Sequence, residues 1–299
     1  MWTILRDGAH PVEITLPALG DDDVLIAVDA TEIAGPRDTR GGIAIVGKVV
    51  EAGARGSMHD GKHVVVGPID PCGECDVCRR GGAAVCPLAV RRDALGARAS
   101  VAARWVVPLG DGLELAAPAA AAVAGDVALA YTLYARTGLG PRDPVVVVGG
   151  SPIARFLVEI LLAKTIAPTA VAAPGPWADW LAQKGVVVAR DRAGLTEAFA
   201  AKSLGTKPWR VIGCDPAAGE AAAALAGPRA TLTLLAGSRA LGVLGAEVLA
   251  REVTIIGVAG AHPDLVVEAA AMCVKAEIDL TGGTTTDPSD PLRTVVRSG

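Results

Sequence analysis

The stretch Pro144-Val-Val-Val-Val-Gly149 decides the fold class of the second half of the chain. It is a continuous apolar run of strand length that ends at a glycine, and such runs are typical of strands buried on both faces in parallel sheets. Segments with the patterns of helices and strands alternate after it. We expect strands over 167–173, 185–189, 210–213, 230–235 and 252–258, and helices over 153–164, 177–184, 195–202, 220–226 and 263–275. This alternation predicts a doubly wound parallel sheet, so the expected fold class is α/β.

The sequence before this sheet has the composition and pattern of a small β-rich domain. Short runs rich in β-branched residues lie at 24–30, 43–51 and 61–67. Such runs, separated by Gly, Pro and Asp, are typical of a small barrel. An alanine-dominated helical stretch follows over 119–136. We therefore expect a barrel domain over 1–117, a Rossmann-like domain over 118–275 and a C-terminal segment over 276–299.

The composition excludes several classes of protein. The chain has 299 residues, of which 51% are hydrophobic and 20% are charged, so we expect folded domains and not disorder. A net charge of −4, without a basic block, makes nucleic acid and anionic membranes poor partners. Mean hydropathy is high at +0.43, but no stretch approaches the ~20 uncharged apolar residues of a membrane span. The start of the chain, Met1 to Asp7, has no charged region followed by an apolar run, which indicates a cytoplasmic protein without a secretory leader.

Four of the six cysteines form a cluster in the sequence. Their spacing is Cys72-x2-Cys75-x2-Cys78-x7-Cys86. Four thiolates in a short loop can close a tetrahedral shell around Zn²⁺, and a closed shell leaves no position for water or substrate, so the cluster predicts a structural zinc site. An iron–sulfur cluster is an alternative because Pro87 follows the last cysteine, but the ferredoxin motif has three residues before that cysteine and not seven. Metal-free thiols are the remaining alternative.

The residues around this cluster resemble those of a known family. The stretch Gly67-Pro-Ile-Asp-Pro-Cys72-Gly-Glu-Cys75-Asp-Val-Cys78-Arg-Arg-Gly81 is similar to the zinc lobe of the zinc-containing alcohol dehydrogenases, in the medium-chain dehydrogenase/reductase superfamily. Segments 49–53, 178–185 and 252–257 resemble further parts of that superfamily, so the resemblance covers most of the chain. It implies a GroES-like barrel with a structural zinc lobe over 67–87, followed by a Rossmann-type sheet. It also implies an oxidoreductase that moves hydride between NAD(H) or NADP(H) and an alcohol, a carbonyl or an activated double bond.

The ligands of the superfamily's second, catalytic zinc are missing from this sequence. The resemblance places the first ligand motif on Ala34-Gly35-Pro36-Arg37, the second on Gly42-Ile43-Ala44 and the third at Gly125, with Asp126 one residue away. A Lewis-acid zinc needs three protein ligands and an open position, and only Asp126 is a candidate ligand. Pro36 also replaces the hydroxyl of the superfamily's proton relay. We therefore predict that the catalytic zinc is lost.

The other polar candidates have ordinary interpretations. We interpret the four histidines as solvated or capping residues, at His10, His59, His63 and His262. Tyr131 or Tyr134 could act as a general acid, but packing of a helix tyrosine is the favoured interpretation. Cys214 and Cys273 lie in apolar stretches and are interpreted as small buried hydrophobic residues.

The superfamily's dinucleotide loop, Gly-x-Gly-x-x-Gly, falls on 149–154 of this chain. Gly149 keeps the turn, while Ser151 and Ala154 replace the second and third glycines. The start of the following helix remains an anion site in principle, and the Ser151 hydroxyl could hydrogen-bond a phosphate. After the next strand, 172–176 carries neither an acidic residue for a ribose nor an Arg for a 2′-phosphate. The predicted cofactor-binding residues are Gly149, Gly150, Ser151, Pro152 and Ile153, with NAD(H), NADP(H) or no nucleotide left open.

Two functions remain open. The first is a zinc-independent oxidoreductase acting on a small molecule that the sequence does not identify, and the second is a catalytically degenerate paralogue that serves as a binding or assembly subunit. A ferredoxin-like electron carrier is disfavoured by the cysteine spacing. The resemblance also implies a homodimer formed through the strand over 252–258. The last residues, 284–299, are too few for the helix and strand that return to the barrel in the superfamily.

Overall fold

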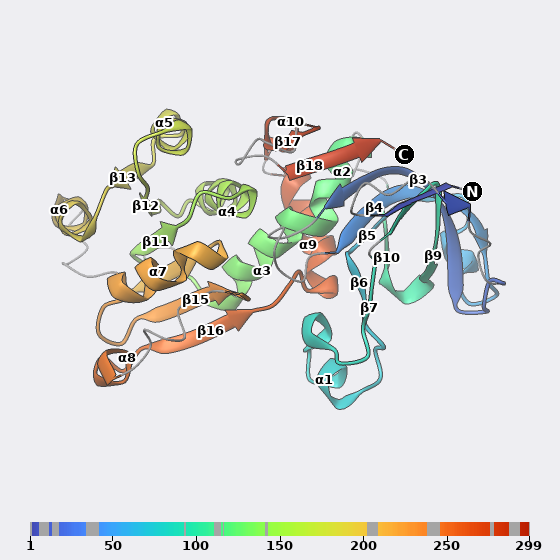
Figure 1. The fold of residues 1–299 in the computed structure, drawn as a ribbon, viewed down its shortest axis with the longest axis horizontal. Helices are drawn as coiled ribbons and strands as arrows, with labels where there is room; N and C mark the ends of the chain where they lie inside the picture. Colours follow the sequence, from blue (N-terminus) through green and yellow to red (C-terminus); the bar gives the residue numbers. More distant parts are fainter. Residues whose placement is uncertain are drawn as a thin grey trace. The chain divides into compact units, whose positions relative to one another are not determined.

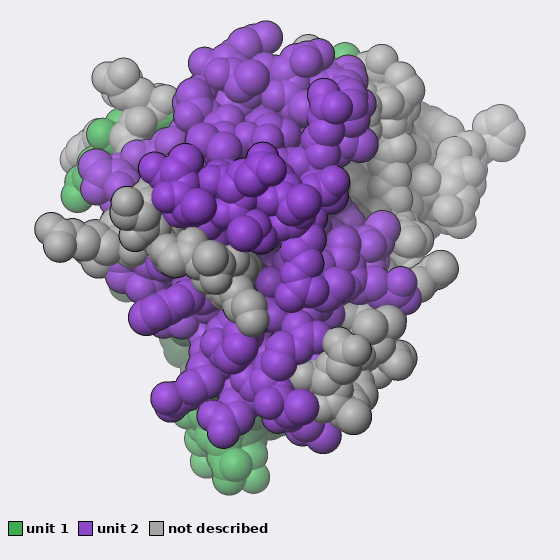
Figure 2. Space-filling view, turned by 90° about the vertical axis from the view of Figure 1, so that its left-hand side faces the viewer, with its two compact units in different colours: residues 1–129, 261–299 green, residues 130–260 purple. Residues whose placement is uncertain are grey.

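A computed structural model gives the structure of the chain, which divides into two compact units (Figures 1 and 2). Unit 1 contains residues 1–129 and 261–299, and unit 2 contains residues 130–260. The structure describes residues 2–5, 12–13, 18–33, 42–92, 94–110, 115, 117–140, 143–201, 209–237, 246–275, 278–286 and 294–298.

Unit 2 is built around the predicted parallel sheet. Its six strands run parallel in the order β13-β12-β11-β14-β15-β16, so the strand order reverses between β11 and β14. The strands are β11 (Val145–Val148), β12 (Thr169–Val171), β13 (Val187–Ala189), β14 (Arg210–Gly213), β15 (Thr231–Leu235) and β16 (Thr254–Val258). The helices are α3 (Ala128–Thr137, which begins in unit 1), α4 (Pro152–Ala163), α5 (Pro176–Gln183), α6 (Arg192–Ala201), η5 (Pro216–Ala218), α7 (Gly219–Leu225) and α8 (Ala246–Ala250). The doubly wound α/β prediction is therefore confirmed.

The core of unit 2 explains why its strands are apolar along their whole length. Figure 1 shows helices on both faces of the sheet, with α7 on the face opposite to α4. On one face, Leu195 and Phe199 of α6 and Ala222 of α7 pack with Val146 and Val211 of the sheet. All four residues of β11 are buried. A central strand covered by helices on both faces has no solvent-facing side, so no polar alternation appears in its sequence.

Unit 1 contains the predicted β-rich domain. Its largest sheet has the order β10-β5-β4-β3-β18-β17, and β9 also pairs with β3. Two smaller sheets have the orders β2-β1-β8 and β6-β7. The strands are β1 (Trp2–Leu5), β2 (Val12–Glu13), β3 (Asp23–Ile33), β4 (Ile43–Ala52), β5 (His63–Val66), β6 (Ile69–Asp70), β7 (Val90–Arg91), β8 (Ala94–Gly96), β9 (Arg98–Ala102), β10 (Val106–Pro108), β17 (Thr284–Thr285) and β18 (Thr294–Ser298). The helical segments are η1 (Ser57–His59), α1 (Asp76–Arg79), η2 (Ala83–Val85), η3 (Ala103–Trp105), α2 (Ala117–Ala122), η4 (Val123–Val127), α9 (Pro263–Lys275) and α10 (Leu280–Gly283).

The two units differ from the domains expected from composition. Helices α2 and η4 belong to unit 1, and so does α9, which contacts η4. The boundaries of the units therefore follow Leu129 and precede Ala261, whereas the expected domain boundaries follow 117 and 275. The division into 1–117, 118–275 and 276–299 stays a prediction about which parts of the chain fold independently.

The C-terminal segment contributes strands to unit 1. We expected 284–299 to be too short for both a returning helix and a returning strand; the structure places the strand β18 there, paired antiparallel with β3, while helix α10 ends at Gly283, before this segment. Val296 lies opposite Glu32 and Ser298 opposite Ala30. A strand of five residues spans about 17 Å, which is long enough for β18 to lie between β3 and β17 in this sheet.

The alanine-rich helix expected over 119–136 is interrupted. A π-helical turn, η4, separates α2 from α3, and Gly125 within it has the non-helical angles φ −107° and ψ −105°. Such π-bulges are often found at functional sites.

Among the described residues, no helix is both long enough and apolar enough to cross a membrane.

Candidate functional site

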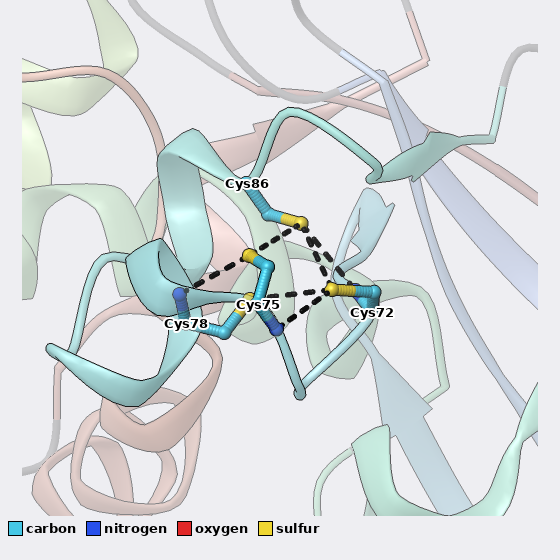
Figure 3. A group of neighbouring side chains, drawn as sticks. All are labelled: Cys72, Cys75, Cys78 and Cys86. Carbon is cyan, nitrogen blue, oxygen red and sulfur yellow. Dashed lines mark hydrogen bonds between the residues drawn. The ribbon is translucent and has the colours of Figure 1, made fainter.

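The four clustered cysteines converge in unit 1 (Figure 3). Their sulfur atoms all lie within 4.8 Å of one another. The Sγ of Cys72 is 3.6 Å from that of Cys86 and 3.9 Å from that of Cys78, and the Sγ atoms of Cys75 and Cys86 are 3.9 Å apart. All six cysteines of the chain are free of disulfides.

Local backbone structure directs these sulfurs inward. Cys75 caps the short helix α1, and its sulfur accepts the backbone N–H of Cys78 at 3.4 Å. The sulfurs of Cys72 and Cys86 accept the backbone N–H groups of Cys75 and Cys72, at 3.4 and 3.5 Å. Gly73 has a φ of +76°, a conformation that side chains with a Cβ rarely adopt, and it allows the turn between the first two cysteines.

This arrangement fits a structural zinc. A tetrahedral Zn²⁺ with Zn–S bonds of ~2.3 Å requires sulfur atoms about 3.8 Å apart, close to the separations in this cluster. The backbone N–H groups of Glu74 and Cys75 lower the pKa of the Cys72 thiol to about 6, which favours the thiolate that binds metal. All four protein ligands would be used, so no coordination position would remain for a substrate.

The zinc lobe is anchored to the rest of unit 1 by contacts that sequence reasoning missed. The Nε2 atom of His262, just before α9, lies 2.6 Å from the carbonyl oxygen of Gly81. The indole Nε1–H of Trp105 donates to the carbonyl of Pro71 at 2.8 Å. Segments far from the lobe in sequence therefore hold both sides of it.

The structure describes two of the three stretches on which the resemblance places the ligands of a catalytic zinc. The residues 34–37 lie outside the described part of the chain. Gly42, Ile43 and Ala44 lie at the start of β4 or just before it, and Gly125 lies in η4. The Cys72 cluster is the only group of three or more metal-ligating side chains among the described residues.

A buried carboxyl group lies next to Gly125. Glu32 of β3 is 0% exposed, and its Oε1 accepts the backbone N–H of Asp126 at 2.9 Å. Its Oε2 atom is buried without a hydrogen-bond partner in the described structure. Gly125 leaves the space for this side chain, because a Cβ at that position would overlap the Glu32 carboxyl group. Sequence reasoning missed Glu32, although a glutamate near the end of an apolar strand was the available signal.

Burial of Glu32, and then the charge of Asp126, raise the pKa of this carboxyl group well above its usual value. A raised folded-state pKa stabilises the protein below the unfolded pKa of about 4.5 and destabilises it progressively as the pH rises through the folded pKa. We expect Glu32→Gln, which cannot ionise, to increase the free energy of unfolding relative to wild type by at least about 1 kcal/mol at pH 8, with little or no gain at pH 4.

Urea unfolding at both pH values measures this difference. Glu51→Gln, at an exposed position of β4, is the matched control for loss of one carboxylate. An equal effect of Glu32→Gln at pH 4 and pH 8 would show that ionisation of Glu32 does not carry the effect.

The glycine loop of unit 2 keeps part of its predicted geometry. Gly149 has a φ of +121°, and Ser151 caps α4, with Pro152 as the first helical residue. The Ser151 hydroxyl is already engaged, because it donates to the carbonyl of Cys214 at 3.0 Å and accepts the N–H of Ala154 at 3.3 Å. It is therefore not available for a phosphate in this conformation.

Two side chains from other elements, which the sequence analysis did not identify, contact Gly150 of this loop. The Oδ2 atom of Asp215 accepts the backbone N–H of Gly150 at 3.2 Å, and its Oδ1 atom accepts the N–H of Ala218 at 2.7 Å. Trp177 of α5 is buried against Gly150, so that a Cβ on this glycine would lie 3.3 Å from the indole Cδ1. In this conformation the Gly150 N–H is not free for a pyrophosphate, because the Asp215 carboxylate already accepts it.

The tyrosines, histidines and isolated cysteines lie in the following environments. Tyr131 is buried, and its ring centroid lies 5.6 Å from that of Tyr134, in agreement with a packing role. His59 is buried in η1, so its interpretation as a solvated or capping residue was wrong; desolvation, followed by Lys62, lowers its pKa. His63 is exposed beside Asp29, and His10 lies outside the described residues. Cys214 and Cys273 are buried, as expected.

Comparisons with known proteins agree with this architecture. Residues 12–114 match the alcohol dehydrogenase GroES-like domain family. No curated protein matches the sequence. An alcohol dehydrogenase from E. coli, solved with NADH, is similar at a TM-score of 0.80 and 18% identity, over 100% of this chain and 98% of that chain.

Two further solved structures have the same fold. A protein described as a zinc-binding dehydrogenase from Sinorhizobium meliloti, bound to NADP, has a TM-score of 0.77 and 18% identity over 100% of both chains. Galactitol-1-phosphate dehydrogenase from Escherichia coli has a TM-score of 0.79 and 15% identity, over 99% of this chain and 98% of that chain. Residues 12–114 thus match the alcohol dehydrogenase GroES-like domain family, and the chain as a whole has the fold of these dehydrogenase structures.

Proposed function

We propose that the chain is an alcohol dehydrogenase-like oxidoreductase that uses NAD(H) or NADP(H) on a small alcohol, carbonyl or activated double bond, without a catalytic zinc. The observation that carries this proposal is the fold match over the whole chain to an alcohol dehydrogenase that was solved with NADH. The glycine turn at Gly149 and the capped start of α4 support it, because these are the backbone features of a dinucleotide loop.

The proposed metal content is one structural zinc, held by Cys72, Cys75, Cys78 and Cys86. Loss of the catalytic zinc is supported by the side chains near its expected place. Among the described side chains there, Glu32 and Asp126 carry carboxyl groups, and a Lewis-acid zinc needs at least three protein ligands. No metal would polarise the substrate in this proposal.

A second candidate function is a catalytically degenerate paralogue that acts as a binding or assembly subunit. The observation that favours it is the occupied loop, where Asp215 and Trp177 lie against Gly150. In this case the structural zinc and the fold would be kept without nucleotide chemistry.

We also propose an oligomeric state and a cellular location for the protein. One of the two edge strands of the sheet in unit 2 is β16, where Ile255 is 45% exposed, and this strand could pair with its copy across a two-fold axis. We therefore propose a cytoplasmic homodimer formed along β16.

Titration calorimetry with NADH and NADPH, combined with turnover of a panel of aldehydes, ketones and enones, tests the proposed function. We expect binding of one of the two nucleotides and turnover that a zinc chelator does not abolish within minutes. Chelator-sensitive oxidation of simple alcohols would contradict the loss of the catalytic zinc. Absence of binding of either nucleotide by folded protein would favour the degenerate subunit.

A further inference from the structure

We propose that Asp215 is a built-in competitor of the nucleotide, because its carboxylate occupies the place where the Gly149–Gly150 loop would receive a pyrophosphate. This inference rests on the proposed function for its ligand, NAD(H) or NADP(H), and it identifies a residue that sets the affinity of the same loop. It follows from the contacts of the loop within unit 2.

The position of Asp215 follows from the topology of the sheet. Strands β11 and β14 are parallel neighbours, with Val148 opposite Gly213. Their carboxyl ends therefore lie side by side at the point where the strand order reverses. Open α/β sheets bind ligands at this point, beyond the carboxyl ends of the strands. Gly149 and Gly150 follow β11 directly, and Asp215 comes two residues after β14.

Both oxygens of Asp215 are held in place. One accepts the N–H of Ala218, the last residue of η5, and the other accepts the Gly150 N–H. A Cβ at Gly149 would overlap the same carboxylate, so the side chain lies directly over the turn. The carboxylate thus places a negative charge where a phosphate group would place one. It also accepts the backbone N–H that a phosphate group would need there.

The other side of the turn is covered by an aromatic side chain. Trp177 is 8% exposed, packs on Gly150 and stacks on Trp180 with ring centroids 5.2 Å apart and planes inclined by 11°. Its indole N–H is buried without an acceptor in the described structure. A nucleotide entering the loop must therefore move this ring and approach a negative charge.

The chemistry predicts that removal of the charge strengthens nucleotide binding. Asp215→Asn keeps the shape of the side chain and an oxygen acceptor, while it removes the repulsion between carboxylate and pyrophosphate. We expect Asp215→Asn to bind NADH or NADPH about tenfold more tightly than wild type at low salt. Because this difference is electrostatic, it should shrink towards twofold in 0.5 M salt.

The experiment is titration calorimetry of wild type, Asp215→Asn and Asp143→Asn with NADH and with NADPH, at low salt and in 0.5 M salt. Asp143 precedes β11, at the amino-terminal end of the strands, and its Oδ2 atom accepts the backbone N–H of Gly140. It is therefore the matched control for loss of one carboxylate that accepts a backbone N–H. Asp215→Ser, which retains a capping oxygen for Ala218, replaces Asp215→Asn if the latter does not fold.

The outcomes separate this inference from the proposed function. Tighter, salt-sensitive binding by the Asp215 variant, with Asp143→Asn like wild type, supports the inference, even if wild type binds no nucleotide and the proposed function fails. Binding by wild type that the Asp215 variant leaves equal or weaker overturns the inference and leaves the proposed function intact. Absence of binding by every folded variant overturns both.

Discussion

Cys75→Ser is expected to lower the melting temperature of unit 1 by roughly 5–10 °C or more. Loss of a structural metal is among the few single changes that cost more than about 4 kcal/mol, and zinc binding in small peptides is worth about 10–16 kcal/mol. The effect on this chain is smaller than that on a peptide, because the sheets of unit 1 retain their own core. Differential scanning calorimetry together with zinc analysis measures the change.

Cys273→Ser is the matched control, since Cys273 is a buried cysteine of unit 1 outside the cluster. It should retain the zinc content of wild type. Nucleotide affinity should survive in the folded fraction of Cys75→Ser, because the glycine loop lies in unit 2. An unchanged melting temperature combined with loss of nucleotide binding would mean that the lobe serves function and not folding.

Gly125→Ala is expected to destabilise the protein by at least about 3 kcal/mol. A Cβ at this position would overlap the Glu32 carboxyl group and come close to its backbone-bonded Oε1 atom. Glu32 and Gly125 are both buried, so neither the carboxyl group nor the added methyl group can move into solvent to relieve the clash. Urea unfolding of the purified variant gives the free energy.

The double variant Gly125→Ala/Glu32→Ala tests the cause of this loss. Removal of the Glu32 side chain should restore at least half of the lost stability, since the two sites interact directly. Gly110→Ala, in unit 1 with open space around the glycine, should be nearly neutral. Additive effects of the two substitutions would exclude the proposed contact between Gly125 and Glu32.

Much of the fold was predictable because it depends on local patterns. The strand Val145–Val148 and the helix after it were readable from an apolar run followed by Gly149 and a Ser-Pro start. The cysteine cluster was readable because its four ligands lie within one short segment, and the spacing alone brings their sulfur atoms together.

The remaining features depend on contacts between distant segments. Burial of Glu32 is set by Gly125, more than ninety positions later, and no local pattern contains that pairing. Asp215 reaches the Gly150 N–H only because β11 and β14 are adjacent. An acidic residue just after a buried parallel strand was a usable signal for Asp215, whereas the pairing of β18 with β3 had no comparable signal.

The zinc content of the purified wild-type chain shows whether the structural zinc site is kept and the catalytic zinc site is lost. Mass spectrometry of the metal, with protein measured by amino-acid analysis, gives the ratio. We expect about one zinc per chain, lost in Cys75→Ser, because the Cys72 cluster is the one group in the described structure with enough ligands. Two zinc ions per chain, or iron with acid-labile sulfide, would contradict it.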